Sequence, residues 1–175
     1  MKDLNNLLEI ISKRKSIRGY LDKEIEKEKL DYLIEAFRLA PSAKNLQPWK
    51  LIIIKDKNII NELIPACKNQ TFIGEAPIVI AVCAFEEEAY GTMGGYMNSY
   101  PLDIGIAFEH LVLAATEQGL GTCWIGAFFE EEVKKVLKVP DKVRVVALTP
   151  VGYPNDAGRD RPRKKTEEII SFDRF

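Results

Sequence analysis

The sequence predicts a layered domain of the α/β or α+β class, because amphipathic helices and short apolar strands alternate along its 175 residues. This length suits one domain with a sizeable core. Hydrophobic residues make up 46% and charged residues 29% of the chain, values that exclude collagen-like, low-complexity and wholly disordered proteins. We therefore expect a single domain over residues 1–175, with a tail of different character at 153–175.

Apolar residues at helical spacing predict five helices. The first ends near Lys15, and the second is stopped by Pro41, which cannot continue a helical hydrogen-bond ladder. The fourth is apolar on nearly every side, which predicts a central buried position, and Gly119 or Gly121 would end it. In chain order the helices are expected within residues 4–15, 30–37, 59–67, 103–118 and 130–138.

Short apolar runs rich in β-branched residues predict four strands between these helices. Residues 49–55 are expected to form a buried strand and 77–84 a second interior strand. The other two strands are expected at 122–125 and 142–152.

The segment 86–101 carries glycines and a proline among soft and aromatic side chains. Two interpretations stay open: a lid over a substrate, or an Ω-loop packed on its own side chains. Its large side chains are Tyr90, Met93, Tyr96, Met97 and Tyr100.

The charge balance indicates neither nucleic acid nor an acidic membrane as a partner. There are 25 Lys and Arg against 26 Asp and Glu, the formal net charge is -1, and the pI is about 6.0. The apolar runs are far shorter than the roughly 18 to 20 residues that cross a bilayer. The N-terminus lacks the apolar core and cleavage site of a signal peptide, so we expect a cytoplasmic protein.

Cysteine and histidine, the residues that commonly bind zinc, are few in this chain. Cys67, Cys83 and Cys123 are widely spaced, so we expect small buried hydrophobic side chains rather than disulfides or a metal site. The one histidine, His110, excludes His-rich zinc sites, and its place in a helical apolar pattern favours a structural role. No metal is predicted.

A basic cluster at the end of the first predicted helix suits an anion. Arg14, Lys15 and Arg18 surround Ser16, and guanidinium groups offer forked, permanently charged donors to phosphate. Basic residues at a helix C-terminus also complement the helix dipole, which is the alternative interpretation. The tail adds Arg161 and Arg163.

Two further motifs suit a flat ligand. The first, residues 40–49, is a polar turn between a helix and a strand; small side chains there let backbone donors approach, and amides offer donors and acceptors. The second, residues 119–128, is a strand entry bracketed by glycines, which permit close approach to a ring. Together with the arginines they could hold a phosphorylated planar heterocycle. The candidate residues are Pro41, Ser42, Ala43, Asn45, Gln47, Trp124, Ile125, Gly126 and Ala127.

These segments, in this order, resemble the FMN-dependent nitroreductase family. The similar motifs are Arg-x-Ser-x-Arg, Pro-Ser-x-x-Asn-x-Gln-Pro-Trp, Gly-Leu-Gly-Thr-x-Trp-Ile-Gly and a C-terminal Arg-x-Arg, spread over about residues 10 to 170. The resemblance implies an α+β three-layer sandwich with a central mixed sheet flanked by helices. It also implies an intertwined homodimer with FMN at the interface, in which residues 153–175 cross to the partner.

The resemblance also implies roles for residues. Arg14 and Ser16 would hold the FMN phosphate or ribityl chain, and Lys15 stands where a second arginine is frequent. Arg18 would lie near flavin N1, where a cation favours the charge that reduction creates. The backbone at Gly126 and Ala127 would address N5. The other implied ligands are Pro41, Ser42, Ala43 and Asn45 from the partner, the phosphate clamp Arg161 and Arg163, and Asn69 or Gln70 at the pyrimidine edge.

The implied activity is an FMN-dependent oxidoreductase. Hydride would pass from NADH or NADPH through flavin N5 to a small acceptor, such as a nitroaromatic or a quinone, in a ping-pong cycle. Alternatives are a flavin carrier or sensor without dedicated turnover, or a relative with other FMN chemistry, reductive dehalogenation or flavin breakdown. The segment between Glu86 and Tyr100 contains no lysine, which ranks dehalogenation lower.

Overall fold

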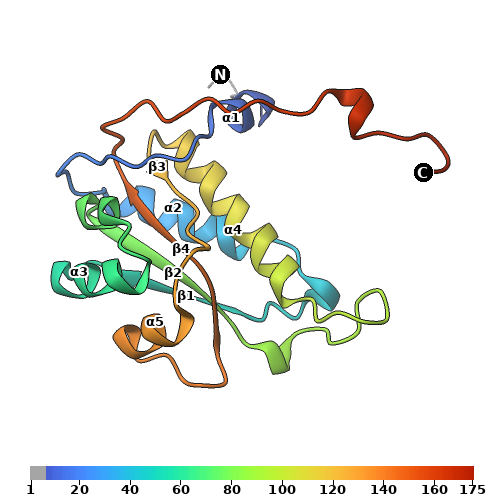
Figure 1. Cartoon of the computed structure of the whole chain (residues 1–175), viewed down its shortest axis with the longest axis horizontal. Helices are drawn as coiled ribbons and strands as arrows, with labels where there is room; N and C mark the ends of the chain where they lie inside the picture. Colours follow the sequence, from blue (N-terminus) through green and yellow to red (C-terminus); the bar gives the residue numbers. More distant parts are fainter. Residues whose placement is uncertain (1–6) are drawn as a thin grey trace.

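The computed structural model describes residues 7–175 and centres on a four-stranded sheet (Figure 1). Its strands are β1 (Trp49–Ile54), β2 (Ile78–Ala84), β3 (Gly121–Thr122) and β4 (Arg144–Gly152). The spatial order is β1-β2-β4-β3, and each neighbouring pair is antiparallel. β2 is buried along its whole length, as predicted for an interior strand.

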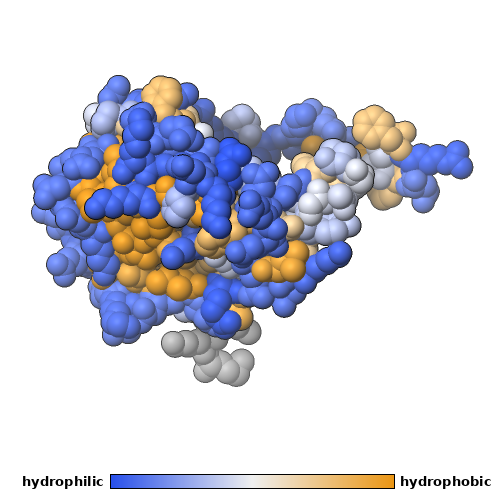
Figure 2. Space-filling model, turned by 90° about the horizontal axis from the view of Figure 1, so that it is seen from below, coloured by the Kyte–Doolittle hydropathy of each residue, from blue (hydrophilic) through white to orange (hydrophobic). Residues whose placement is uncertain are grey.

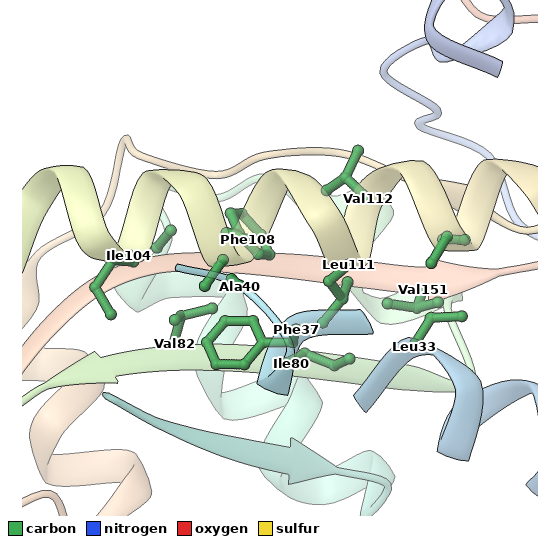
Figure 3. Packing of buried hydrophobic residues seen from close by; sticks show 14 of the residues in the cluster. Leu33, Phe37, Ala40, Ile80, Val82, Ile104, Phe108, Leu111, Val112 and Val151 are labelled. Atoms are coloured by element: carbon green, nitrogen blue, oxygen red, sulfur yellow. The ribbon is translucent and has the colours of Figure 1, made fainter. Parts of the chain in front are cut away.

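Two helices cover one face of the sheet, α2 (Lys27–Arg38) and α4 (Tyr100–Glu117). Every second residue of β2 points to this side, because side chains alternate across a strand. Figure 3 shows the resulting contacts, with α2 and α4 side chains meeting those of the sheet. The fully buried members include Leu33, Ile80, Val82, Ile104, Phe108, Leu111 and Val151.

The opposite face carries α3 (Lys57–Ala66) and α5 (Glu130–Leu137). The other alternate residues of β2 pack there, beneath both helices. Their cluster includes Ile60, Leu63, Val79, Ala81 and Val133. Helices, sheet and helices therefore form three layers, and the α+β sandwich is confirmed (Figure 1).

Three predicted details of the sheet are corrected. β1 is an edge strand and is only partly buried, because one of its sides has no neighbouring strand. β3 has two residues rather than four, and Ile125 joins the sheet only through a bridge to Leu148. The parallel pairing expected of a mixed sheet is limited, among the described residues, to one bridge between Ser16 and Thr122.

The first helix, α1 (Leu7–Lys13), packs on α4 and starts the described part of the chain. Residues 4–6 of the predicted helix lie outside the described residues. An apolar groove runs between α1, α2 and α4, and His110 lines it together with Leu7, Leu39 and Leu113. We call this the α1–α4 groove.

Exposed apolar side chains occur on the helices beside this groove. Leu8 and Ile11 of α1 are exposed, and so are Leu102 and Ile106 of α4. The predicted central, buried position of α4 is therefore confirmed for the face that packs on the sheet and is wrong for the face that carries Leu102 and Ile106. One face of α4 packs on the sheet, while part of its remaining apolar surface faces outward.

The tail after β4 first follows the body and then leaves it. Asn155 donates its N–H to the Gly19 carbonyl at 2.9 Å, and the Tyr153 hydroxyl donates to Glu26 of the segment before α2 at 2.6 Å. The end of the tail stands off the body and carries hydrophobic residues on its surface (Figures 1 and 2). These exposed side chains are Ile169, Ile170, Phe172 and Phe175.

Short 3-10 turns occupy the connections, at Ala43–Asn45, Thr71–Glu75, Glu86–Glu88 and Thr166–Glu168. Across residues 7–175, none of the helices combines the length and the apolar character that crossing a membrane requires.

Candidate functional site

The segment after α1 is held against the edge of the sheet. Ile17 donates its N–H to the Thr122 carbonyl at 2.8 Å, and its side chain is buried. A Cβ at Gly121 would lie 2.9 Å from the Ile17 side chain, so only glycine lets the two segments approach this closely. Because neighbouring residues of an extended segment point to opposite sides, Ser16 and Arg18 face away from Ile17.

The tail folds over this segment and creates a basic pocket. Arg14, Lys15, Ser16 and Arg18 line one part of it, and the tail supplies the rest, in a cavity of about 120 Å³. A second hollow of about 390 Å³ adjoins it and shares Ser16, Arg18 and two tail arginines. We call the first cavity the basic pocket; its tail residues are Arg159, Asp160, Arg161 and Arg163, and Ser12 completes the lining.

Asp156 fixes the turn that brings the tail to this pocket. Its carboxylate accepts the backbone N–H of Arg18 at 2.8 Å and that of Gly158 at 2.7 Å. Gly158 adopts a φ of +63°, and a Cβ there would lie 2.8 Å from the Cβ of Lys15. A side chain at this position would therefore be strained and would separate the tail from the basic segment.

One carboxylate lies among the cations of the basic pocket. Asp160 pairs with Lys15 at 2.8 Å, and this contact holds the pKa of the Asp160 carboxyl below its ordinary value. The Asp160 side chain is almost fully exposed, so the ion pair contributes little to stability. The pocket therefore retains a strong excess of positive charge.

The predicted ring-side residues lie in the segment after β3. Gly126 and Ala127 are exposed, and Gln70 donates its side-chain amide to the Ala127 carbonyl at 3.0 Å and to the Cys67 carbonyl at 2.9 Å. The structure thus brings Gln70 and Ala127 together, whereas Asn69 is an exposed neighbour with a φ of +58°.

Trp124 and Ile125 have different surroundings. The Trp124 ring is 43% exposed and meets Phe108 of α4 edge to face, with 4.3 Å between the ring centroids. Ile125 is buried in the core, and its N–H donates to Leu148 at 2.8 Å. Its side chain, N–H and carbonyl are therefore all engaged within the fold.

The thiol beside this segment, that of Cys123, lies inside the fold. Cys123 is buried, and burial raises the pKa of its thiol. Cys67 and Cys83 are buried as well, and none of the three forms a disulfide. The predicted structural role of the cysteines agrees with this burial.

The loop at residues 41–47 lies against the N-terminal turn of α4 and is absent from the lining of the basic pocket. Ala43 donates its N–H to Asp103 at 2.8 Å, and the Ser42 hydroxyl accepts the Gln47 N–H at 2.9 Å. Lys44, Asn45 and Gln47 all have positive φ, and Pro41, Asn45 and Gln47 are exposed. The basic pocket and the 41–47 loop, both predicted to contact the cofactor, are thus separate surfaces of one chain.

The site contains residues that sequence reasoning missed. Asp156 and Gly158 follow a strand and look like ordinary turn residues in the sequence. Arg159 belongs to the basic cluster of the tail but was not a candidate ligand, and it lines both cavities. Asp103, which holds the 41–47 loop, stands out in the sequence only as the first residue of a predicted helix.

Comparison with known proteins identifies the relationship. The profile of the Nitroreductase family matches residues 11–73 and 64–153 of this chain. The chain belongs to the nitroreductase family. A solved structure described as a nitroreductase family protein from Clostridium novyi NT is 38% identical, covers 89% of both chains and superposes with a TM-score of 0.80.

Two other members of the family bear more specific names. An FMN-dependent nitroreductase from Clostridium difficile R20291 is 30% identical, covers 95% of this chain and 98% of its own, and superposes with a TM-score of 0.80. An Archaeoglobus fulgidus protein, provisionally named NADH dehydrogenase/NAD(P)H nitroreductase, is 31% identical over 87% of this chain and 88% of its own. The resemblance predicted from the motifs is thereby confirmed.

Proposed function

We propose that this nitroreductase-family chain is an FMN-dependent oxidoreductase that takes hydride from NADH or NADPH and passes it to a small acceptor in a ping-pong cycle. The observation that carries the proposal is the basic pocket, in which two segments about 145 residues apart in sequence bring arginines to one small cavity. Membership in the family and the names of its relatives support the same activity.

The donors of the basic pocket fit a phosphate monoester. Arg14, Arg161 and Arg163 offer forked charged donors, and the Ser16 hydroxyl adds a neutral one. The adjoining hollow gives room for a ribityl chain, with Arg18 lining both spaces. Bound FMN would supply hydride transfer at N5, and the chain's own residues would bind and orient it.

The described residues that we assign to the ring would supply polarity rather than an acid or a base. Arg18 presents a positive charge, and its guanidinium carbon lies 5.9 Å from the centroid of the Phe72 ring, which limits its orientation. Gln70, held by the Ala127 and Cys67 carbonyls through its NH₂ group, would offer its side-chain oxygen to the pyrimidine edge. The single histidine lines the α1–α4 groove, so no imidazole is assigned to proton transfer.

We also propose a homodimer with FMN at its interface. The 41–47 loop is separate from the basic pocket of its own chain, so it would reach the ring of the cofactor bound by the partner. Exposed apolar residues on α1 and α4, and on the tail at 153–175, give the dimer surfaces to bury. Under this proposal residues 1–175 form one FMN-binding domain that exchanges its tail.

The cytoplasm is the compartment we propose, because reduced nicotinamides are available there. Three buried cysteines without a disulfide agree with a reducing environment.

The visible spectrum of the purified protein tests the proposed function. Absorption bands of oxidised flavin are expected, and they should bleach when NADH or NADPH is added and return with an acceptor. Rapid bleaching would favour the enzyme over a flavin carrier. A colourless protein that FMN does not reconstitute would refute the assignment.

Replacing Arg18 distinguishes an effect on the reduction potential of the flavin from an effect on the affinity for FMN. Arg18→Gln keeps a hydrogen-bond donor of similar reach but removes the charge, so the reduced cofactor loses more stabilisation than the oxidised one. The midpoint potential should fall by about 30 mV for each 1.4 kcal/mol of this difference. Dye equilibration measures the potential, and fluorescence titration measures the affinity for oxidised FMN. An unchanged potential with collapsed affinity would assign Arg18 to the phosphate instead.

A further inference from the structure

A buried carboxylate at the start of α4 joins two loops that are distant in the sequence. Asp103 is only 3% exposed, and Ser99, four residues earlier, is fully buried. One Asp103 oxygen accepts the Ala43 N–H at 2.8 Å, and the other accepts the Ser99 hydroxyl at 2.6 Å. Both hydrogen bonds come from neutral donors.

A carboxylate in this position is expensive to bury. Removing its charge from water costs free energy that hydrogen bonds only partly offset, and an apolar side chain on a buried helix face avoids the cost. The helix N-terminus stabilises the charge but does not explain the two bonds to other segments. Asp103 therefore serves to hold other segments of the chain in place.

The first segment that it holds is the strained 41–47 loop. Lys44, Asn45 and Gln47 have φ values of 52°, 57° and 51°, in the left-handed region that few residues other than glycine adopt. Such conformations persist only where neighbouring contacts enforce them. Hydrogen bonds within the loop help, since Asn45 donates its N–H to the Ser42 carbonyl and Leu46 donates its N–H to the Ala43 carbonyl. The Ser42 hydroxyl also accepts the Gln47 N–H, and Asp103 anchors Ala43 from outside the loop.

The second segment is the aromatic loop at residues 90–99. Ser99 closes its base, because its N–H donates to the Tyr90 carbonyl at 2.8 Å and its hydroxyl accepts the Tyr90 N–H at 3.1 Å. The tip extends outward and exposes Tyr96 to 83%. The two loops also touch directly, since the Lys44 ammonium lies 4.4 Å from the centroid of the Tyr90 ring.

We propose that Asp103 and Ser99 are positioning residues that fix the 41–47 loop and the 90–99 loop as one unit over the flavin ring. This inference rests on the proposed function in one respect, that the 41–47 loop belongs to an FMN site. The 90–99 loop then forms part of the wall of the pocket that an acceptor contacts. The fit of the acceptor depends on the Asp103 carboxylate, although this group touches neither the cofactor nor the acceptor.

The experiment compares Asp103→Asn and Ser99→Ala with the conservative Ser99→Thr. In Asp103→Asn the amide can keep the bond to Ala43 only by turning its NH₂ toward Ser99, whose hydroxyl hydrogen then loses its acceptor. Both disruptive variants should speed chymotrypsin cleavage after Tyr96 in the full chain about tenfold, and Ser99→Thr should not. The double variant should add little to either single one, because both break the same connection.

Flavin binding is the second measurement. The loops face the ring rather than the phosphate, so both disruptive variants should weaken FMN and riboflavin by the same factor, about three- to tenfold. They should also raise KM for a bulky acceptor more than they change kcat. Lys134→Met is the matched control, since Lys134 is a buried charge of α5 on the other face of the sheet and donates to the Asp141 carbonyl. It should lower stability while leaving cleavage at Tyr96 and flavin affinity unchanged.

Failure of this inference differs from failure of the proposed function. Cleavage and flavin affinity that stay at the wild-type level in Ser99→Ala would overturn it, and so would a loss confined to FMN. A wild-type chain that binds no flavin refutes the proposed function, while the cleavage rates still decide whether the loops are coupled. If Asp103→Asn does not fold, Ser99→Ala and Ser99→Thr carry the test.

Discussion

Arg14→Ala and Arg161→Ala are each expected to weaken FMN binding about ten- to a hundredfold. Each substitution removes a charge-assisted hydrogen bond to phosphate, which contributes roughly 1.5 to 3 kcal/mol. The two arginines lie on separate segments of the basic pocket, one before β1 and one in the tail. Equal losses from both would mean that both segments hold the same phosphate.

The comparison with riboflavin makes this prediction specific. Riboflavin has the ring and ribityl chain of FMN but no phosphate, so its affinity should hardly change in either variant. Lys135→Ala is a suitable control, because Lys135 is an exposed cation of α5 that pairs with Glu132 at 2.8 Å, far from the pocket in the fold. Fluorescence titration with unchanged FMN affinity in both arginine variants would contradict the site.

The expected ionic-strength dependence follows from the same charges. Arg161 and Arg163 are exposed, and the charges of exposed groups are screened by salt, so added salt should weaken FMN binding more than riboflavin binding.

The sequence predicted the elements well where local pattern decides them. The spacing of Leu30, Leu33 and Phe37 locates α2, and Gly119, with a φ of +73°, follows the end of α4 as expected. The burial of the individual strands was less predictable from the sequence. The apolar run of β1 resembles that of β2, but only the non-local order of the sheet decides which of them forms the edge.

In the candidate site, too, local sequence pattern reveals some residues, and only the fold reveals the others. The basic residues at 14–18 form a local cluster that the sequence displays directly, and the structure brings them to the tail arginines. Asp103 gave no such signal, because its partner Ala43 lies 60 positions away and an Asp near a helix start is common. Likewise the role of Asp156 becomes visible only from its hydrogen bond with the Arg18 N–H, 138 positions away in the chain. Contacts of this kind follow from topology, which periodicity does not reveal.

Deleting the tail from Arg159 onward should destroy the dimer and most of the FMN affinity. The deleted segment contains two predicted phosphate ligands and the exposed apolar residues Ile169, Ile170, Phe172 and Phe175. Burying each such side chain against a partner contributes about 1.5 to 3 kcal/mol, so losing four of them removes a large part of the association energy. The surfaces left uncovered on α1 and α4 should then cause aggregation.

A shorter deletion, from Thr166 onward, separates the two effects. It keeps Arg161 and Arg163 but removes the apolar end, so light scattering should show a weakened dimer. Because the proposed site needs the partner's 41–47 loop at the ring, riboflavin affinity should fall along with the dimer even though every phosphate ligand remains. A monomeric, well-folded and FMN-replete product of the longer deletion would contradict the exchanged tail. If the dimer survives the shorter deletion, the association energy comes mainly from the helical surfaces beside the α1–α4 groove rather than from the end of the tail.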